Sequence, residues 1–284
     1  MISRFKTFSL NVRARLLRYE RPAVMGIVNA TPDSFFAASR TPDRDSISRR
    51  AAEMIAAGVD MIDVGAYSTR PGADPVGVEE EIDRLRMAIV AVREVDQQIP
   101  VSVDTFRADV AGLAVTEMGA DIINDISGGE FDDKMFDVAA ATGAPYILTH
   151  NPGTESNLHP ASGYGDVVAD VTRWLGSRLR TLALLGVNDV IVDPGFGFGK
   201  SIEDNYRLMA ELALFEMLGR PILVGVSRKS MIYRPLGIEP ADAHDGTTAL
   251  NTVALLSGAS ILRVHDVKSA VQTVKLIQLL DSNK

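Results

Sequence analysis

The sequence predicts an α/β fold, a (β/α)8 TIM barrel that forms a single domain. Eight short apolar, strand-like runs alternate with helix-like segments along the 284 residues, as is typical of parallel βαβ units. Each run ends on a polar or charged residue, and these endings are Asn29, Asp63, Asp104, Asn124, His150, Asp193, Arg228-Lys229 and Arg263 with His265. Because such a barrel gathers the C-terminal ends of its strands at one mouth, the endings predict a polar site there.

The first strand, Ala23–Ala30, is apolar throughout, as expected of a strand buried on both faces. The strands that follow are predicted at Met61–Ala66, Val101–Thr105, Ile122–Ile126, Pro145–His150, Val190–Asp193, Ile222–Ser227 and Ile261–Asp266.

Helices are predicted between the strands. The acidic turn Glu79-Glu80-Glu81 suits a helix N-terminus, where negative charge is favourable. Gly58, Gly119 and Gly186 are stop signals. The other predicted helices are Asp45–Ala57, Asp109–Met118, Lys134–Thr142, Val168–Leu185, Asp204–Leu218, Thr247–Leu256 and Val267–Leu280.

The barrel is expected to span residues 23–284, with residues 1–22 as a short N-terminal extension. In that extension, Thr7–Val12 and Arg15–Tyr19 are expected to pair as a β-hairpin that closes the barrel floor. The length agrees, because barrels of this kind commonly run to about 250 residues.

Composition excludes several kinds of function. The chain has no Cys, so disulfides, zinc thiolate sites and thiol nucleophiles are excluded. The net charge of −8 argues against nucleic acid or an acidic membrane surface as a partner. No signal-peptide pattern and no run of about 20 apolar residues is visible. We therefore expect a cytoplasmic protein that acts on small molecules.

The segment Val190–Lys200 (VIVDPGFGFGK) is rich in glycine but matches neither phosphate-binding motif. A P-loop would need Gly at Pro194, and a dinucleotide fingerprint would need Gly at Lys200. Either the segment is a plain flexible loop, or its small residues let Asp193 and the backbone approach a flat ligand closely. Phe198 or Phe196 would then pack against that ligand.

Two further segments, Leu223–Ser230 and Ile261–Asp266, bring cations to the mouth. Exposed Lys and Arg are commonplace, so surface charge is one reading of the first segment. Arg263 and His265 are two residues apart and point to the same side of a strand. Inward-facing cations are costly unless they are paired or bind an anion, and Lys229, Arg263 and His265 are interpreted as an anion clamp.

Hydrogen-bond acceptors stand against this clamp, namely Asp104, Asn124 and Asp193. Carboxylates and an amide that converge from separate strands suit a donor-rich planar heterocycle, such as an aminopyrimidinone. Asn29 could lend one oxygen to Mg²⁺, which keeps several waters and rests on substrate phosphates. The residues thus predict a barrel that binds a donor-rich heterocycle together with a phosphate or diphosphate.

Seven ordered motifs carry a resemblance to a known family: Met25–Phe35 (MGIVNATPDSF), Ser68–Gly72 (STRPG), Val103–Thr105, Ile123–Ile126, Asp193–Lys200, Ser227–Met231 and Arg263–Asp266. With these motifs, the chain resembles the dihydropteroate synthases of folate biosynthesis from about Val24 to its C-terminal helix.

The resemblance implies roles for residues of this chain. Those that would bind the pterin are Asp104, Asn124, Asp193 and Lys229. Those that would hold the diphosphate are Asn29, Thr69, Arg263 and His265, with Mg²⁺ bridging through Asn29. Those that would seat p-aminobenzoate are Arg70, Pro71, Phe198 and Ser227. Those expected to act in catalysis are Asp104, Lys229, Arg263 and His265.

The implied reaction condenses 6-hydroxymethyl-7,8-dihydropterin diphosphate with p-aminobenzoate, giving 7,8-dihydropteroate and pyrophosphate. In the family, the diphosphate departs before the amine bonds, which leaves a cationic pterin methylene that nearby carboxylates tolerate. The resemblance further implies a sulfonamide target and a homodimer built through barrel helices, often the last ones.

The chain departs from the family pattern at three places. Tyr67 stands where Glu is common, Phe36–Arg40 where the family often has Asp-Gly-Gly, and Thr149 where Met is frequent. These departures put loop closure and the sulfonamide response in doubt more than pterin binding. Two alternatives follow: a pterin-binding domain for methyl transfer to a corrinoid partner, and a non-catalytic pterin-binding homologue. His150 is expected to form a hydrogen bond behind the site rather than in it.

Overall fold

The fold is the predicted barrel of parallel strands. The computed structural model describes residues 5–30, 43–67, 76–155, 157 and 163–282. Eight strands form one sheet in the order β8-β7-β6-β5-β4-β3-β10-β9. They are β3 (Ala23–Asn29), β4 (Met61–Gly65), β5 (Val101–Asp104), β6 (Ile122–Asp125), β7 (Tyr146–Thr149), β8 (Val190–Asp193), β9 (Leu223–Val224) and β10 (Ile261–Val264). A parallel bridge between Val192 of β8 and Ile222, the residue before β9, closes the ring.

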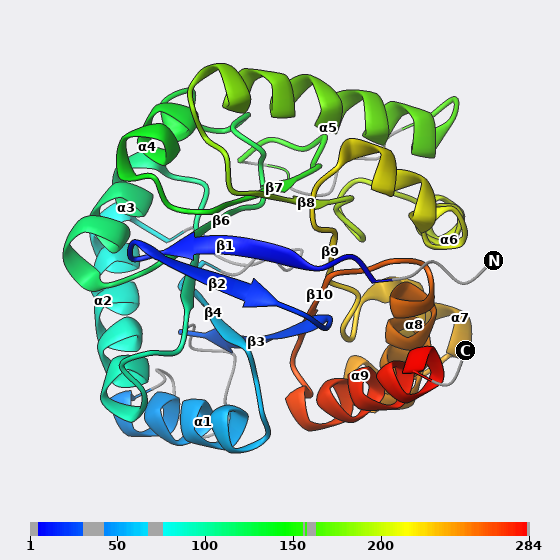
Figure 1. Cartoon of the computed structure of the whole chain (residues 1–284), viewed down its shortest axis with the longest axis horizontal. Coiled ribbons are helices and arrows are strands. Elements are labelled where there is room, and N and C mark those ends of the chain that lie inside the picture. The colour runs from blue at the N-terminus through cyan, green and yellow to red at the C-terminus, as the bar shows by residue number, and fades with distance from the viewer. Residues whose placement is uncertain (1–4, 31–42, 68–75, 156, 158–162, 283–284) are drawn as a thin grey trace.

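Helices cover the outside of the ring (Figure 1). The α-helices are α1 (Arg44–Ala56), α2 (Val78–Val95), α3 (Ala108–Leu113), α4 (Met135–Thr142), α5 (Val167–Leu184), α6 (Ile202–Ala210), α7 (Ser230–Leu236), α8 (His244–Leu256) and α9 (Val267–Ser282). The short helices are η1 (Ala114–Met118), η2 (Leu212–Leu218) and η3 (Pro240–Asp242). None of the helices in the described part of the chain is long and apolar enough to cross a membrane.

The region after the seventh barrel strand differs from the prediction. A strand was expected over Ile222–Ser227, but β9 is only two residues long. The chain turns at Arg228, whose φ of +57° is left-handed, and enters α7, which was not predicted. Pro235 inside α7 obscures the helical pattern, because proline normally ends a helix.

The predicted N-terminal hairpin is confirmed. β1 (Phe8–Val12) pairs antiparallel with β2 (Arg15–Tyr19). The two turn residues, Arg13 and Ala14, both have positive φ, as the tight hairpin turns require. Figure 1 shows the hairpin lying across the near end of the barrel. Phe8, Leu10 and Val12 pack there against inward-facing residues of the strands, so the hairpin closes the barrel floor as predicted.

The barrel interior changes from apolar to polar along the strands. We call the lower cluster the floor; its members include Phe8, Leu10, Val12, Met25, Met61, Ile122, Ile147, Ile191, Leu223 and Ile261. Two residues further along a strand a side chain points to the same side. From Met61, Ile122, Ile191 and Ile261 this step reaches Asp63, Asn124, Asp193 and Arg263. These four and Asp104 of β5 form what we call the polar layer, nearer the C-terminal mouth.

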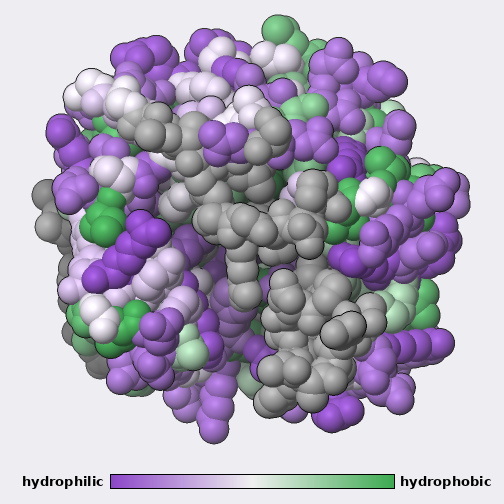
Figure 2. Space-filling view, turned by 180° about the vertical axis from the view of Figure 1, so that it is seen from behind, coloured by the Kyte–Doolittle hydropathy of each residue, from purple (hydrophilic) through white to green (hydrophobic). Residues whose placement is uncertain are grey.

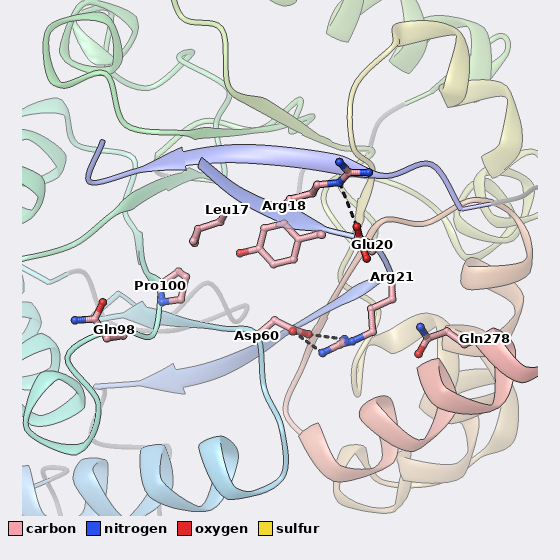
Figure 3. A pocket seen from close by; sticks show the side chains of 9 residues that line it. Leu17, Arg18, Glu20, Arg21, Asp60, Gln98, Pro100 and Gln278 are labelled. Carbon is pink, nitrogen blue, oxygen red and sulfur yellow. Dashed lines mark hydrogen bonds and ion pairs between the residues drawn. The ribbon is translucent and has the colours of Figure 1, made fainter. Parts of the chain in front are cut away.

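The N-terminal face of the barrel carries a separate, open hollow beside the hairpin (Figure 3). Its lining includes residues 17–21, Asp60, Gln98, Pro100 and Gln278. Arg21 donates to both oxygens of Asp60, at 2.9 and 2.7 Å, and Asp60 also accepts the N–H of Val24 at 2.8 Å. These bonds fasten the hairpin to the barrel at the end away from the polar layer.

Candidate active site

Arg263 lies at the centre of the polar layer and is paired with two carboxylates. Its Nε donates to Asp63 Oδ2 at 2.7 Å, and its Nη2 donates to Asp104 Oδ2 at 2.6 Å. Asp63 is fully buried, and the Asp104 side chain is 12% exposed. Arg263 therefore faces inward as predicted, and the structure answers how its charge is tolerated: it is paired with carboxylates.

One guanidinium against two carboxylates leaves a surplus of negative charge. Burial raises the pKa of Asp104 to about 7; Arg263 acts in the opposite direction, and Asp63 adds to the rise. Burial works to lower the pKa of Arg263, but Asp63 and Asp104 outweigh it, so this pKa is raised and the guanidinium stays charged. Asp104 is therefore a carboxyl group that takes up a proton near neutral pH.

Asn124 reaches the same centre from β6. Its Nδ2 donates to Asp63 Oδ2 at 3.0 Å, so its side-chain oxygen is left as an acceptor for other donors. The second oxygen of Asp63 is buried and has no hydrogen-bond partner among the described residues. Such an oxygen is costly unless a ligand or water supplies a donor.

Asp63 is the functional residue that our residue assignments missed. It was one of the polar strand endings, but it was given no role. Its inward direction follows from Met61, two residues earlier, so strand alternation alone could have placed it with Asp104 and Asn124.

Asp193 and Lys229 lie on either side of residues 194–199, which we call the glycine loop. Asp193 Oδ1 accepts the N–H of Gly195 at 2.7 Å; burial raises its pKa, and Lys229 acts in the opposite direction. Lys229 Nζ donates to the carbonyl of Phe196 at 2.5 Å and lies 4.9 Å from the ring centroid of Phe198. Burial lowers the pKa of Lys229 to about 8, against the effect of Asp193.

Ser227 and His265 join the segments that follow β9 and β10. Ser227 Oγ accepts the backbone N–H of His265 at 3.2 Å and lies 3.0 Å from its Nδ1. Arg228 donates to both oxygens of Asp266, at 3.1 and 2.9 Å. These contacts hold the left-handed turn before Lys229, a conformation that is strained for a residue other than glycine.

The remaining predicted residues are placed less centrally. Asn29 is the last residue of β3 and is partly exposed. Thr69, Arg70 and Pro71 lie outside the described residues, as do the altered positions Phe36–Arg40. Tyr67 packs edge-on against Phe106, with ring centroids 5.1 Å apart.

Behind the site, His150 Nδ1 lies 3.0 Å from Lys200 Nζ, in line with the hydrogen bond expected there.

Figure 2 shows the face away from the hairpin, on which the described residues are largely hydrophilic. Among the described residues, no three His, Cys, Asp or Glu side chains cluster in a way that could hold a metal ion.

Comparison with known proteins shows the family to which the chain belongs. The model of a family described as pterin binding enzymes matches residues 25–265. A dihydropteroate synthase of Synechocystis sp. is 39% identical over 264 residues, which cover 92% of this chain and 91% of that protein. The chain belongs to the dihydropteroate synthase family.

Solved structures of the dihydropteroate synthase family have the same fold. Xanthomonas albilineans dihydropteroate synthase with 4-aminobenzoic acid superposes with a TM-score of 0.87 at 37% identity, covering 97% of this chain and 99% of that one. The same enzyme in complex with 7,8-dihydropteroate gives a TM-score of 0.84 at 36% identity, covering 96% and 98%. The predicted TIM barrel and the predicted family are both confirmed.

Proposed function

We propose that this protein condenses 6-hydroxymethyl-7,8-dihydropterin diphosphate with p-aminobenzoate to give 7,8-dihydropteroate and pyrophosphate. The observation that carries the proposal is the polar layer, in which Asp63, Asp104 and Asn124 surround Arg263 above an apolar floor. The complexes of the Xanthomonas albilineans relative with 4-aminobenzoic acid and 7,8-dihydropteroate support the same substrate and product here.

The pterin is assigned to the acceptors of the polar layer. Asp104, Asp193 and the side-chain oxygen of Asn124 offer acceptors to its amino and ring N–H groups. Asp63 orients Asn124 and Arg263 through one oxygen, and its second oxygen, beside the first, has no partner within the described part of the chain. Lys229 supplies a donor at the edge of the pocket. A flat, donor-rich ring would satisfy the acceptor groups that are otherwise costly to bury.

The diphosphate is assigned to Arg263, His265, Asn29 and Thr69, the last of which lies outside the described residues. The two carboxylates engage Nε and Nη2 of Arg263, so we assign its Nη1 to the anion. His265 is held at the mouth through its bonds to Ser227. Since the carboxylates fix the guanidinium before the substrate arrives, it need not reorganise as charge develops on the leaving group.

Mg²⁺ is proposed as the cofactor, with Asn29 as the protein oxygen that holds it. A single amide oxygen at the mouth suits Mg²⁺, because this ion usually keeps several waters and binds through substrate phosphates. When bound, Mg²⁺ would neutralise charge on the departing diphosphate.

In the proposed reaction, the bond between the pterin methylene carbon and the diphosphate oxygen breaks, and the electron pair leaves with pyrophosphate. Negative charge from Asp104 and its neighbours stabilises the cationic pterin that remains. The aniline nitrogen of p-aminobenzoate then bonds to the methylene carbon and loses one proton. No nucleophilic side chain is needed. We assign Arg70, Pro71, Phe198 and Ser227 to seat p-aminobenzoate.

A homodimer is proposed through the last barrel helices. Leu276, Leu279 and Leu280 of α9 are exposed and share one helix face, and Val253 is exposed on the neighbouring α8. A second copy would cover this apolar face.

We further propose that residues 1–22 form an N-terminal extension, that residues 23–284 form the barrel domain, and that the protein is cytoplasmic.

Release of pyrophosphate by the purified protein tests the function. The assay supplies dihydropterin diphosphate, Mg²⁺ and p-aminobenzoate. Release that requires p-aminobenzoate, with 7,8-dihydropteroate formed, is expected. Tight binding of the pterin diphosphate without turnover would instead favour a non-catalytic homologue, in which Tyr67 and the altered residues Phe36–Arg40 have removed activity.

A further inference from the structure

The ammonium group of Lys200 is enclosed by acceptors behind the glycine loop. Its Nζ lies 2.8 Å from the carbonyl oxygen of Gly195, 3.1 Å from that of Phe198 and 3.3 Å from that of His150. The His150 ring nitrogen Nδ1 lies at 3.0 Å. An ammonium group has three N–H donors, so these acceptors satisfy all of them.

His150 takes part as a neutral acceptor. Burial, and after it the charge of Lys200, lowers the pKa of His150 to about 2. Because an ammonium group can only donate, we assign the ring proton to Nε2 and leave Nδ1 free to accept from Lys200. The ring packs edge-on against Trp174, with centroids 5.0 Å apart, which fixes its orientation.

The glycine loop is built around this ammonium group. Gly195 has a φ of +72°, and a Cβ atom there would lie 1.9 Å from the carbonyl oxygen of His150. The loop therefore passes directly against the end of β7. Asn205 Oδ1 accepts the N–H of Gly197 at 2.7 Å and holds the middle of the loop. Two loop carbonyls, those of Gly195 and Phe198, are thereby available to Lys200.

The same loop contacts Lys229. The carbonyl of Phe196 accepts from Lys229 Nζ at 2.5 Å, and the ring of Phe198 lies 4.9 Å from that ammonium group. A Cβ atom on Gly197, between these residues, would lie 3.1 Å from Lys229 Cδ. One short loop thus holds the carbonyls that bind Lys200 and the groups that position Lys229.

Keeping this lysine charged is costly. Burial lowers the pKa of Lys200 to about 7, in part offset by Asp193, while Lys229 lowers it further. Hydrogen bonds offset the cost of burying a charge, and the acceptors around Lys200 supply them. None of the steps in the proposed reaction uses Lys200, so its contribution must come from the loop that it binds.

We propose that Lys200 is a positioning residue: its ammonium group fixes the glycine loop, and the loop in turn fixes Lys229 and Asp193 for the pterin. This inference rests on the proposed function, because Lys229 and Asp193 are assigned there to the pterin. Lys200 itself does not contact the substrate.

The test compares Lys200→Met with a matched control, Arg93→Met. Arg93 is likewise a cation bound to carbonyls, those of Ile99 and Gly119, but it lies at the N-terminal face, where it pairs with Asp121. The Kd of dihydropterin diphosphate is measured by calorimetry. We expect an increase of about tenfold or more for Lys200→Met, and a change within about twofold for Arg93→Met even where its thermal stability falls.

Lys200→Gln covers the case in which Lys200→Met does not fold. Its amide retains N–H donors but carries no charge, so its Kd is expected to exceed that of the wild type by more than about twofold and to stay below that of Lys200→Met. A Kd within about twofold of the wild type, in a folded variant of either kind, would overturn the proposal. Failure of the wild-type protein to bind the pterin diphosphate would instead overturn the proposed function.

A double-mutant cycle with Lys229→Met separates positioning from general destabilisation. If Lys200 acts largely through Lys229, Lys200→Met should raise the Kd by about threefold or less in the Lys229→Met background, compared with about tenfold or more in the wild type. The same factor in both backgrounds would show that Lys200 does not act through Lys229.

Discussion

Asp104→Asn is expected to stabilise the fold while removing pterin binding. Burial raises the pKa of Asp104 from 3.8 to about 7 in the folded protein. Below pH 3.8 the carboxyl group is protonated in both the folded and the unfolded state, so its ionisation does not change the stability of the fold. Between the two pKa values the folded state keeps a proton that the unfolded state releases, so stability falls as the pH rises. Above pH 7 the full cost is present.

The size of this cost follows from the shift. A rise from 3.8 to about 7 is about three units, and each unit corresponds to about 1.4 kcal/mol. The ionised carboxylate therefore costs the folded state up to about 4 kcal/mol at pH 8. The amide of the variant cannot ionise and avoids this cost, and Arg263 remains paired with Asp63.

Urea unfolding at several pH values measures the effect. The free energy of unfolding of Asp104→Asn should exceed that of the wild type by up to about 4 kcal/mol at pH 8, and this difference should shrink toward zero near pH 4. Asp133→Asn, at an exposed position, is the matched control and should show no such trend. A variant that is less stable than the wild type at pH 8 would refute the reasoning. Asp104 would then both bind the pterin and stabilise the fold, whereas residues of a binding site often lower the stability of a protein.

Three further predictions concern the same mouth. Asp193→Asn should abolish pterin affinity in a binding assay while leaving the fold intact; binding like that of the wild type would contradict the pterin assignment. Arg263→Ala should weaken the diphosphate substrate far more than hydroxymethyl pterin, and equal losses for the two ligands would argue against the clamp. Gly195→Ala should lower the free energy of unfolding by about 3 kcal/mol, because its side chain would clash with the His150 carbonyl. Gly186 is also left-handed but has open space around it, so Gly186→Ala should lower this free energy by only about 1 kcal/mol. Equal losses of stability in the two variants would contradict the clash.

Strand alternation explains why so much of the fold was predictable. Apolar runs with polar endings indicated each barrel strand, and the residue step of two that defines the floor also defines the polar layer. The seventh strand was predicted too long because Ile222–Ser227 is apolar enough for a strand. Its last residues instead form the turn into α7, and that turn depends on the bonds from Arg228 to Asp266 and Thr247.

The pairing within the site could not be predicted from one sequence. Inward-facing Arg263 left two options, a carboxylate partner or a bound anion. Its partners Asp63 and Asp104 are 200 and 159 residues away along the chain. No local pattern connects residues so far apart. Lys200 is a similar case, since the sequence presents it as the end of a glycine-rich motif while its acceptors include His150, 50 residues earlier.

The hairpin floor has a consequence for the order of events. With Phe8, Leu10 and Val12 packed across one end of the barrel, that end is closed, so a ligand reaches the polar layer from the mouth. A ligand that lies against Asp63 must therefore bind before, and leave after, any ligand that lies above it at Ser227 or His265. The N-terminal hairpin supplies no group to the reaction, but by closing the floor it determines the order in which substrates bind and products leave.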